Sequence, residues 1–496
     1  MKVIIIGSGL GGLSCGALLA KNGFEVTVLE KEPVIGGCLQ CFMRRGAKFE
    51  TGMHFIGSAA RGQTLHKMMH YLEIADKLTL SPLNADGYDV VGIAGERFPY
   101  AMGRHAFVEQ LAARFPHQRE CLERYFDLVE LVSSASTIHS LGKTLGNDAV
   151  SMEYMLRSIN EVVSSVVSDP LLQKVLVGNQ PLYAGEWNKT PFATHAFIMD
   201  FYNQSSFRVV GGSDAIAHAL HNTIKRYGGR VLTRHQATHI ACSDTRATGV
   251  EVNHQLMLEA DYVISTLHPQ RTLELLNTPL LRPIFIKRIS EIENTVGCFT
   301  VYMEFKEGQM PYMNNNFYGY NDGTPWHCEQ YDEQTWPKGY MYMHLCHEDG
   351  ARFAKTGEIL CYMWMKDVAR WIGTQRGQRG QDYEDFKRRK AEKLIDSVDR
   401  ACPGLRQAIK HYYTSTPLTY LDYTGTSEGS MYGVARNIHK GPAGRVPHRT
   451  RVPNLFLAGQ NTNSHGMLGV MVGTLLTCAE FVPAERLFQQ INTEQS

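Results

Sequence analysis

The first thirty residues of the chain constrain its fold more strongly than any other stretch. Residues 3–6 form a β-branched run, Val-Ile-Ile-Ile, which predicts a buried parallel strand. This run enters a glycine-rich turn, Gly7-Ser8-Gly9-Leu10-Gly11-Gly12, with the full G-x-G-x-x-G spacing. A helix-like segment follows as far as Asn22-Gly23, and a second strand ends at the acid Glu30. This order of strand, glycine-rich turn, helix, strand and acid predicts a dinucleotide site.

Each part of this unit has its own chemical task. Gly7 permits the tight turn, Gly9 lets a pyrophosphate approach the backbone, and Gly12 lets helix and strand pack closely. The N-terminus of the helix offers free N–H groups and a positive dipole end to the phosphates. Glu30 stands where a carboxylate accepts a hydrogen bond from a ribose 2′-hydroxyl, and it would repel a 2′-phosphate.

The alternative for this stretch is a signal peptide, a membrane span or a lipid anchor at Cys15, because Lys2 precedes apolar residues that extend to Ala20. Glycines interrupt the apolar stretch, and the strand that follows Gly23 fits a continuing sheet. No run of 18 or more apolar residues occurs in the sequence. We therefore expect neither export nor a spanning helix.

A chain of 496 residues is too long for one simple core, so we expect two domains or one core with a large insertion. Its 50 basic and 49 acidic residues balance and form no basic stripe, which argues against nucleic acid as a partner. The 11 cysteines are scattered and odd in number, which indicates reduced thiols and a cytoplasmic location.

Two groups of residues invite a metal or redox interpretation. Cys38 and Cys41 form a C-x-x-C pair, but no second pair accompanies them. A second group lacks ligand spacing and consists of His327, Cys328, His344, Cys346 and His347. We expect no metal. We interpret Cys38 and Cys41 as two small thiols that line a tight loop; a redox disulfide between them is the alternative.

The middle of the chain predicts two kinds of structure. Residues from about 60 to 205 show helical spacing of apolar residues, as in 107–115 and 121–131, and carry no second nucleotide motif. Residues 297–365 contain three strands with alternating side chains, which suits an antiparallel sheet with one buried face. We expect the helical region to cover a site, and peripheral contact of an amphipathic face with a membrane is the alternative.

The C-terminal part supplies a second strand–turn–helix unit. Residues 453–460 predict a buried strand that leaves into a turn, and Gly466 begins a helix that extends to about Phe481. The N-terminus of this helix would lie near a phosphate or a flavin carbonyl. Such units at both ends of a chain predict one discontinuous domain with the middle of the chain inserted.

Four segments besides the opening fingerprint carry a family resemblance: Gly36-Gly37, Gly211-Gly212, Leu457 to Gln460, and Gly469-Val470. They resemble FAD-dependent oxidoreductases of the carotenoid (phytoene) desaturase and isomerase family, and the resemblance covers nearly the whole chain. The stretches that most resemble the retinol saturase (all-trans-retinol 13,14-reductase) branch are 36–38, 49–57 and 416–419.

The resemblance and the two strand–turn–helix units predict an α/β fold, in which a discontinuous Rossmann-type FAD-binding domain holds an inserted substrate domain of antiparallel sheet plus helices. The FAD-binding domain is expected to comprise residues 1–75, 206–290 and 406–496. The substrate domain is expected to comprise a helical part, 76–205, and an antiparallel-sheet part, 291–405. A single fingerprint indicates a deeply held FAD rather than an exchanging nicotinamide.

The resemblance also implies roles for individual residues. Gly7, Gly9 and Gly12 would hold the FAD pyrophosphate, and Glu30 and Lys31 would lie at the adenosine ribose. The other implied FAD contacts are Gly36, Gly37, Cys38, Ala237, Gly459, Gln460, Leu468, Gly469 and Val470. Two positions depart from the wider superfamily, which often has arginine at Cys38 and commonly an acid at Gln460.

A flavin transfers a hydride at N5, and a polyene C=C bond that gains or loses a hydride exchanges a proton at the neighbouring carbon. The candidate catalytic residues are His54, Tyr423 and His465; isomerisation would need no dedicated acid. We expect an enzyme that saturates, desaturates or isomerises C=C bonds of a lipophilic polyene or isoprenoid. The sequence does not specify its electron donor or acceptor. The alternatives are an amine-oxidase-like flavoprotein and a non-enzymatic prenyl-lipid carrier, and the intact fingerprint with Glu30 disfavours the carrier.

Overall fold

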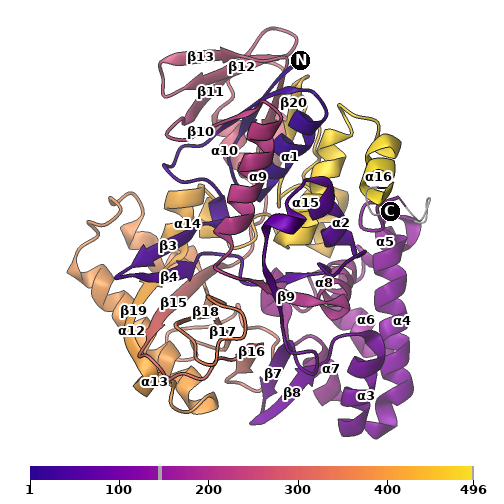
Figure 1. Cartoon of the computed structure of the whole chain (residues 1–496), viewed down its shortest axis with the longest axis vertical. Helices are drawn as coiled ribbons and strands as arrows, with labels where there is room; N and C mark the ends of the chain where they lie inside the picture. The colour runs from indigo at the N-terminus through magenta and orange to yellow at the C-terminus, as the bar shows by residue number, and fades with distance from the viewer. Residues whose placement is uncertain (143–147, 494–496) are drawn as a thin grey trace.

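Two large sheets, with helices packed against them, organise the fold (Figure 1). The computed structural model describes residues 1–142 and 148–493. The first sheet has five parallel strands in the order β10, β2, β1, β14, β20. Its strands come from distant parts of the chain: β1 (Lys2–Ile6), β2 (Glu25–Leu29), β10 (Arg230–Leu232), β14 (Tyr262–Ser265) and β20 (Leu455–Leu457). A parallel sheet assembled in this way confirms the predicted Rossmann-type fold.

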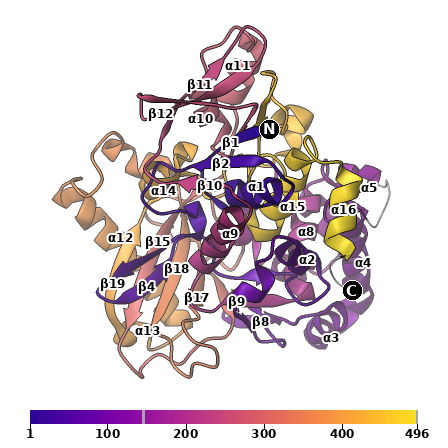
Figure 2. The ribbon, with the colours of Figure 1, turned by 45° about the horizontal axis from the view of Figure 1, so that its top comes forward.

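The alternation of side chains along β1 explains how both faces of this sheet are covered. Val3 and Ile5 pack into the core that contains the helices, whereas Ile4 and Ile6 pack into a separate core on the other face. Three helices cover the first face and lie side by side (Figure 2): α1 (Leu10–Lys21), α9 (Asp214–Arg226) and α15 (Gly466–Cys478). An antiparallel meander covers the second face: β11 (Ala237–Cys242), β12 (Ala247–Val252) and β13 (Leu256–Glu259).

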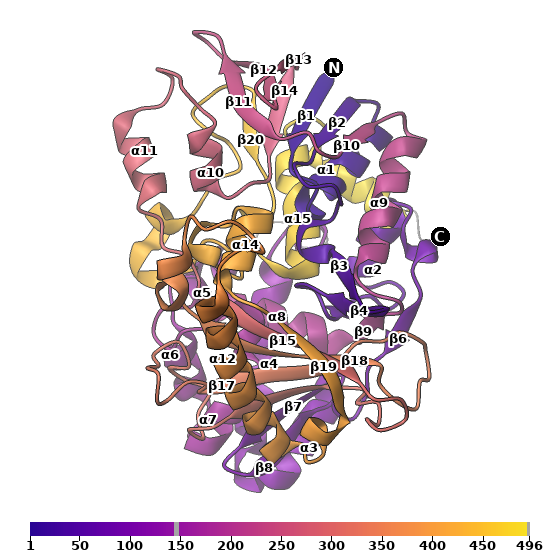
Figure 3. The same cartoon turned by 90° about the vertical axis from the view of Figure 1, so that its left-hand side faces the viewer.

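The second sheet has seven strands in the order β19, β15, β18, β17, β16, β7, β8. Its pairs are antiparallel except for β16 with β7. The strands are β7 (Asp89–Ile93), β8 (Glu96–Tyr100), β15 (Gly297–Phe305), β16 (Asn316–Tyr320), β17 (Gly339–His344), β18 (Thr356–Met363) and β19 (Ile409–Ser415). Helix α12 (Gln381–Ala401) lies across one face (Figure 3), where Tyr383, Leu394 and Val398 pack with Phe299 and Ile359.

Shorter elements connect the two sheets and build the helical layer. The other strands are β3 (Cys41–Arg44), β4 (Ala47–Glu50), β5 (Ile56–Gly57), β6 (Leu80–Pro82) and β9 (Ser206–Val209). The other α-helices of the described residues are α2 (Thr64–Tyr71), α3 (Arg104–Arg114), α4 (Arg119–Ala135), α5 (Asp148–Tyr154), α6 (Ile159–Val166), α7 (Pro170–Leu176), α8 (Phe192–Gln204), α10 (Pro269–Glu274), α11 (Pro283–Ser290), α13 (Leu405–Ala408), α14 (Pro417–Thr424) and α16 (Ala484–Thr493).

The structure departs from the sequence expectation in two segments. Residues 76–205, expected to be helical, also contribute the β7–β8 hairpin to the seven-stranded sheet. Ala94 and Gly95 connect these strands and both have positive φ, which suits the twist of a two-residue hairpin loop. Strand β19 pairs with β15, so residues 409–415 also belong to this sheet, although the expectation placed them in the FAD-binding domain.

The junction between β1 and α1 is packed so closely that only glycine fits at Gly12. A Cβ atom added there would lie 1.9 Å from the carbonyl oxygen of Gly7. At Gly16, in the same helix, the nearest atoms to an added Cβ would be side-chain methyl groups of Ile224 and Val28, at 3.0 and 3.1 Å.

We predict that Gly12→Ala lowers the free energy of unfolding by roughly 1–3 kcal/mol, because the clash is with backbone that cannot move aside easily. Gly16→Ala is the matched control, and its change should stay within about 1 kcal/mol, since alanine also favours the helix. Urea denaturation of both variants measures the difference. A Gly12→Ala variant as stable as the wild type would show that the helix does not approach the turn this closely.

Candidate active site

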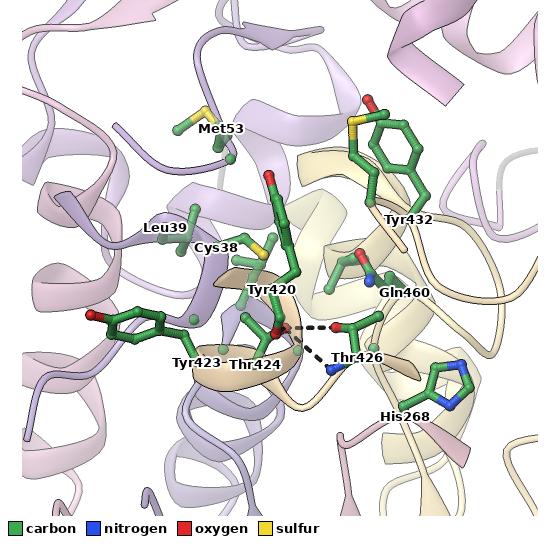
Figure 4. Close-up of a pocket in the computed structure, with 18 of the residues that line it drawn as sticks. Cys38, Leu39, Met53, His268, Tyr420, Tyr423, Thr424, Thr426, Tyr432 and Gln460 are labelled. Carbon is green, nitrogen blue, oxygen red and sulfur yellow. Dashed lines mark hydrogen bonds between the residues drawn. The ribbon is translucent and has the colours of Figure 1, made fainter. Parts of the chain in front are cut away.

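One cavity of about 540 Å³ joins the glycine-rich turn to the seven-stranded sheet. Its walls come from segments that lie far apart in the sequence and converge in Figure 4. The labelled lining residues include Cys38, Leu39 and Met53 from the N-terminal part, Tyr420, Tyr423, Thr424 and Thr426 from α14 and the turn after it, and Gln460 from the C-terminal part. The cavity therefore depends on the chain returning to its first βα unit near its end.

The glycine-rich turn presents bare backbone to this cavity. Gly7 has a φ of +98°, and its N–H donates a hydrogen bond to the carbonyl of Leu29. Gly9 lines the cavity, and a Cβ atom added there would meet no atom within 4 Å. Gly36, with a φ of +116°, forms a parallel bridge with Gly9 and donates to the carbonyl of Ser8. The glycine-rich turn and the Gly36-Gly37 pair therefore lie next to each other at the cavity wall.

Glu30 is held beside this turn by three hydrogen bonds. Its Oε2 accepts from the backbone N–H and the hydroxyl of Ser8, at 3.1 and 2.6 Å. Its Oε1 accepts from the backbone N–H of Glu32 at 2.9 Å. The side chain is buried and lines the cavity, so its carboxylate is fixed at the end of β2 with lone pairs left over for a ligand.

The structure brings most of the predicted site residues to the main cavity. Those that line it are Gly7, Gly9, Glu30, Lys31, Gly36, Gly37, Cys38, His54, Ala237, Tyr423, Gly459, Gln460 and Val470. Gly12 does not, because it packs against the Gly7 carbonyl. Leu468, Gly469 and His465 line a separate, small cavity of about 50 Å³. This placement reflects the helical periodicity of α15, since Val470 and Met467 face the main cavity.

Two of the three candidate catalytic residues are poorly placed for proton transfer in the main cavity. Tyr423 is 40% exposed at the cavity edge, and its ring points away from Tyr432 (Figure 4) and lies under the Arg376 guanidinium. His465 lies in the small cavity, where burial and the nearby Arg436 lower its pKa to about 4. A neutral imidazole at physiological pH is not a proton donor of useful strength.

His54 is the third candidate, and it lines the main cavity between two buried carboxyl groups. Its Nδ1 lies 3.4 Å from Oε2 of Glu358 and 3.6 Å from Oε2 of Glu50. Burial alone would lower the pKa of His54, but the two carboxyl groups outweigh burial and raise it. Glu50 and Glu358 are not among the site residues that the sequence predicts; the available signal is an acid, Glu358, inside the otherwise apolar strand 357–363.

The wall formed by the seven-stranded sheet and its neighbours is aromatic and largely uncharged. The hydroxyl groups of Tyr320, Tyr420 and Tyr432 donate to the backbone carbonyls of Gly178, Thr51 and Pro181, at 2.5, 3.2 and 3.0 Å. These bonds satisfy the polar end of each side chain and leave the rings to line the cavity. The hydroxyl of Tyr362, which also belongs to this wall, is buried and has no hydrogen-bond partner among the described residues.

The thiols of the C-x-x-C pair are not activated. Cys38 and Cys41 are free thiols, and burial raises their pKa values to about 11 and about 12. Neither thiol is therefore activated as a thiolate. Within residues 1–142 and 148–493, no group of three or more histidine, cysteine or acidic side chains could hold a metal ion.

Comparison with known proteins places this geometry in a family. The family model for flavin-containing amine oxidoreductases matches residues 10–477. Human all-trans-retinol 13,14-reductase is 26% identical, over 100% of this chain and 88% of its own length. Prolycopene isomerase 2 from an Oncidium hybrid is 23% identical over 98% of this chain and 84% of its own. The 4,4'-diapolycopene oxygenase of a Methylomonas species is 23% identical over 94% of both chains.

Solved structures share the fold. An oxidoreductase from Methanosarcina mazei superposes with a TM-score of 0.63 at 16% identity, over 96% of this chain and 99% of that one. Putrescine oxidase bound to putrescine gives 0.62 at 14% identity, over 99% of both chains. Since the family match extends over nearly the whole chain and the glycine-rich turn opens onto the cavity, the protein belongs to the flavin-containing amine oxidoreductase family and is an FAD-dependent oxidoreductase.

Proposed function

We propose that this enzyme acts on C=C bonds of a lipophilic polyene or isoprenoid of the carotenoid or retinoid kind. The observation that carries the proposal is the continuity of one cavity, which has bare glycine backbone and Glu30 at one part of its wall and tyrosine rings at another. The three relatives described above are named for reactions of retinol and of carotenoids. Their similarity extends over almost the full chain, which supports a substrate of the same class here.

The residues present fit FAD. Gly9 leaves an open space in which a side chain would stand, and Gly36 and Gly37 extend this bare surface. The N-terminus of α1 lies directly behind the turn, where free N–H groups favour a pyrophosphate. Glu30 would accept a ribose hydroxyl, and Gln460 would offer a neutral contact from the other end of the chain. Bound FAD would supply hydride transfer at its N5 atom.

The wall near β17 and β18 fits an apolar ligand better than an amine. The lining residues from β16 to β18 and the loop between β16 and β17 are Tyr320, Cys328, Gly339, Tyr340, Met341, Leu360, Cys361 and Tyr362, and none is acidic. A protonated amine that left water for this surface would lose its hydration without gaining a counter-charge. A polyene would lose no polar hydration and would bury its apolar surface against the rings.

A visible spectrum and a lipid extract of the purified protein test this proposal together. We expect absorption bands at roughly 370 and 450 nm, which are typical of bound flavin, and an extracted polyene or isoprenoid. In Gly9→Val, a branched side chain would occupy the space for the pyrophosphate, so the variant should lose its flavin while it remains folded. A Gly9→Val protein that retains full flavin would contradict the assigned turn. An enzyme that carries flavin but oxidises amines and extracts no such lipid would contradict the substrate class.

Peripheral contact with a membrane is part of the same proposal, because a lipophilic substrate is stored there. No helix among residues 1–142 and 148–493 is long and apolar enough to cross a bilayer. Helix α11 packs on α10, whose Arg271 and Glu274 line the cavity, and it exposes Ile284 (79%) and Ile286 (41%) beside Lys287. Exposed aliphatic side chains next to a basic residue fit an anionic lipid surface.

Flotation with vesicles that contain phosphatidylserine measures this contact. We expect the double substitution Ile284→Glu and Ile286→Glu to lower vesicle binding severalfold, since two carboxylates would replace the apolar contact and repel the lipid. The control is the double substitution Leu256→Glu and Met257→Glu, which places the same two charges at exposed apolar positions on β13. Equal flotation of all three proteins would reject α11 as the contact surface.

A further inference from the structure

We infer that His54 is the proton donor of this cavity and that Glu50 and Glu358 hold it in its cationic form, so that the site is arranged to saturate a C=C bond. The inference rests on the proposed function and extends it, because it names both a catalytic residue and the direction of the reaction. The relatives described above are named for a reduction, an isomerisation and an oxygenation, so their names do not agree on a direction, and no comparison assigns a role to His54.

The two carboxyl groups have fixed orientations. Oε1 of Glu358 accepts from the backbone N–H of Glu50 at 2.9 Å, and Oε1 of Glu50 accepts from the backbone N–H of Ser213 at 2.8 Å. The second oxygen of each group, Oε2, therefore lies toward Nδ1 of His54. The distance from Nδ1 to Oε2 is 3.4 Å for Glu358 and 3.6 Å for Glu50. Three separate elements, β4, β18 and the segment before α9, converge to position these atoms.

The side chains of this cluster are buried, and few other charged groups act on them. The side chains of His54, Glu50 and Glu358 are only 8%, 3% and 2% exposed. The positive charge of Arg208, on β9, acts on His54. Its guanidinium donates to the carbonyl oxygen of His54 at 3.0 Å and to Oδ1 of Asn316 at 2.8 Å. Two further ionisable groups, the Tyr302 phenol and the Cys298 thiol on β15, lie within the electrostatic influence of Glu358, whose charge raises their pKa values. In such surroundings opposite charges interact strongly.

His54 and Glu358 share one proton at neutral pH. Burial raises the pKa of Glu358 to about 8; the charge of His54 opposes this rise, and Glu50 adds to it. The pKa of His54 is raised above its ordinary value of 6.5, because the carboxyl groups outweigh burial and Arg208. Groups this close titrate together, so their shared proton is present at neutral pH and is lost only as the pH rises above the ordinary histidine range.

The remaining ring nitrogen can deliver this proton. Nε2 of His54 is buried without a hydrogen-bond partner among the described residues, and the side chain lines the cavity. Reduced FAD, replenished by an external two-electron reductant, would supply a hydride to one alkene carbon. The π electron pair then forms a C–H bond at the neighbouring carbon with the proton of Nε2, and the N–H electron pair stays on the ring. Neutral His54 regains its proton from water when product leaves.

The direction follows from this protonation state. Saturation consumes a proton, and it needs an acid that is charged before the reaction begins. Desaturation would need a base with a free electron pair, and two carboxyl groups beside Nδ1 oppose such a state of His54. The arrangement therefore favours addition of hydrogen to the substrate over its removal.

The test compares pH profiles of the FAD-loaded enzyme, reduced by dithionite without oxygen and given all-trans-retinol. The wild-type rate should fall as the pH rises through the titration of the pair. In Glu358→Gln, which keeps the Oε1 acceptor, this fall should occur roughly one pH unit lower or more, because one carboxylate no longer stabilises the cation. His54→Asn should lose about 100-fold or more in rate and should retain its flavin. The control is Glu480→Gln. Glu480 pairs with His448, with 2.8 Å between Oε1 and Nε2, and neither residue lines the cavity, so this substitution should leave the pH profile unchanged.

A measurement that does not depend on turnover separates this inference from the proposed function. In histidine-labelled protein, NMR should show one buried ring whose titration moves to lower pH in Glu358→Gln and remains in place in Glu480→Gln. An unshifted ring, or a His54→Asn enzyme that retains flavin and full rate, would overturn the inference. If the ring shifts but wild-type enzyme never reduces retinol, the substrate proposal fails and the protonation of His54 stands.

Discussion

The approach of Gly12 to the carbonyl of Gly7 is the contact on which the rest of the structure depends. It lets α1 begin immediately after β1, so that the helix N-terminus and the bare backbone of Gly9 face the same space. Strands β14 and β20 then extend the parallel sheet from β1, and they bring distant parts of the chain to the same edge. The cavity exists because each of these segments leaves the sheet at that edge, beside the turn.

Much of this arrangement could be predicted from local sequence patterns. The fingerprint, Glu30 and the C-terminal strand–turn–helix are short motifs whose geometry depends on nearby residues, so the sequence indicated the α/β fold and the flavin site. The β7–β8 hairpin was missed because its strands are short and its loop, Ala94-Gly95, is not a strong turn signal. Leu468 and Gly469 were assigned to the flavin by resemblance, but the periodicity of α15 turns them toward the smaller cavity.

The charged cluster could not be predicted in the same way. Glu50 and Glu358 are 308 residues apart and meet only because β4 packs beside β18. A single acid inside an apolar strand suggests a functional group, but the sequence does not show what that group faces. The tyrosines of the cavity wall could not be predicted either. The hydroxyl groups of Tyr420 and Tyr432, which line the cavity, donate to backbone carbonyls of distant segments. Tertiary contacts of this kind decide the substrate side of the site, whereas local motifs decide the cofactor side.

We propose that one cavity holds FAD beside a polyene and that the enzyme reduces the polyene. The most direct measurement mixes reduced, FAD-loaded enzyme with all-trans-retinol in the absence of oxygen and follows the flavin band at roughly 450 nm together with the polyene absorbance. We predict that one equivalent of flavin is oxidised for each equivalent of polyene that loses a conjugated double bond. A flavin that stays reduced with retinol, in an enzyme whose oxidised form is reduced by an amine such as putrescine, would contradict it.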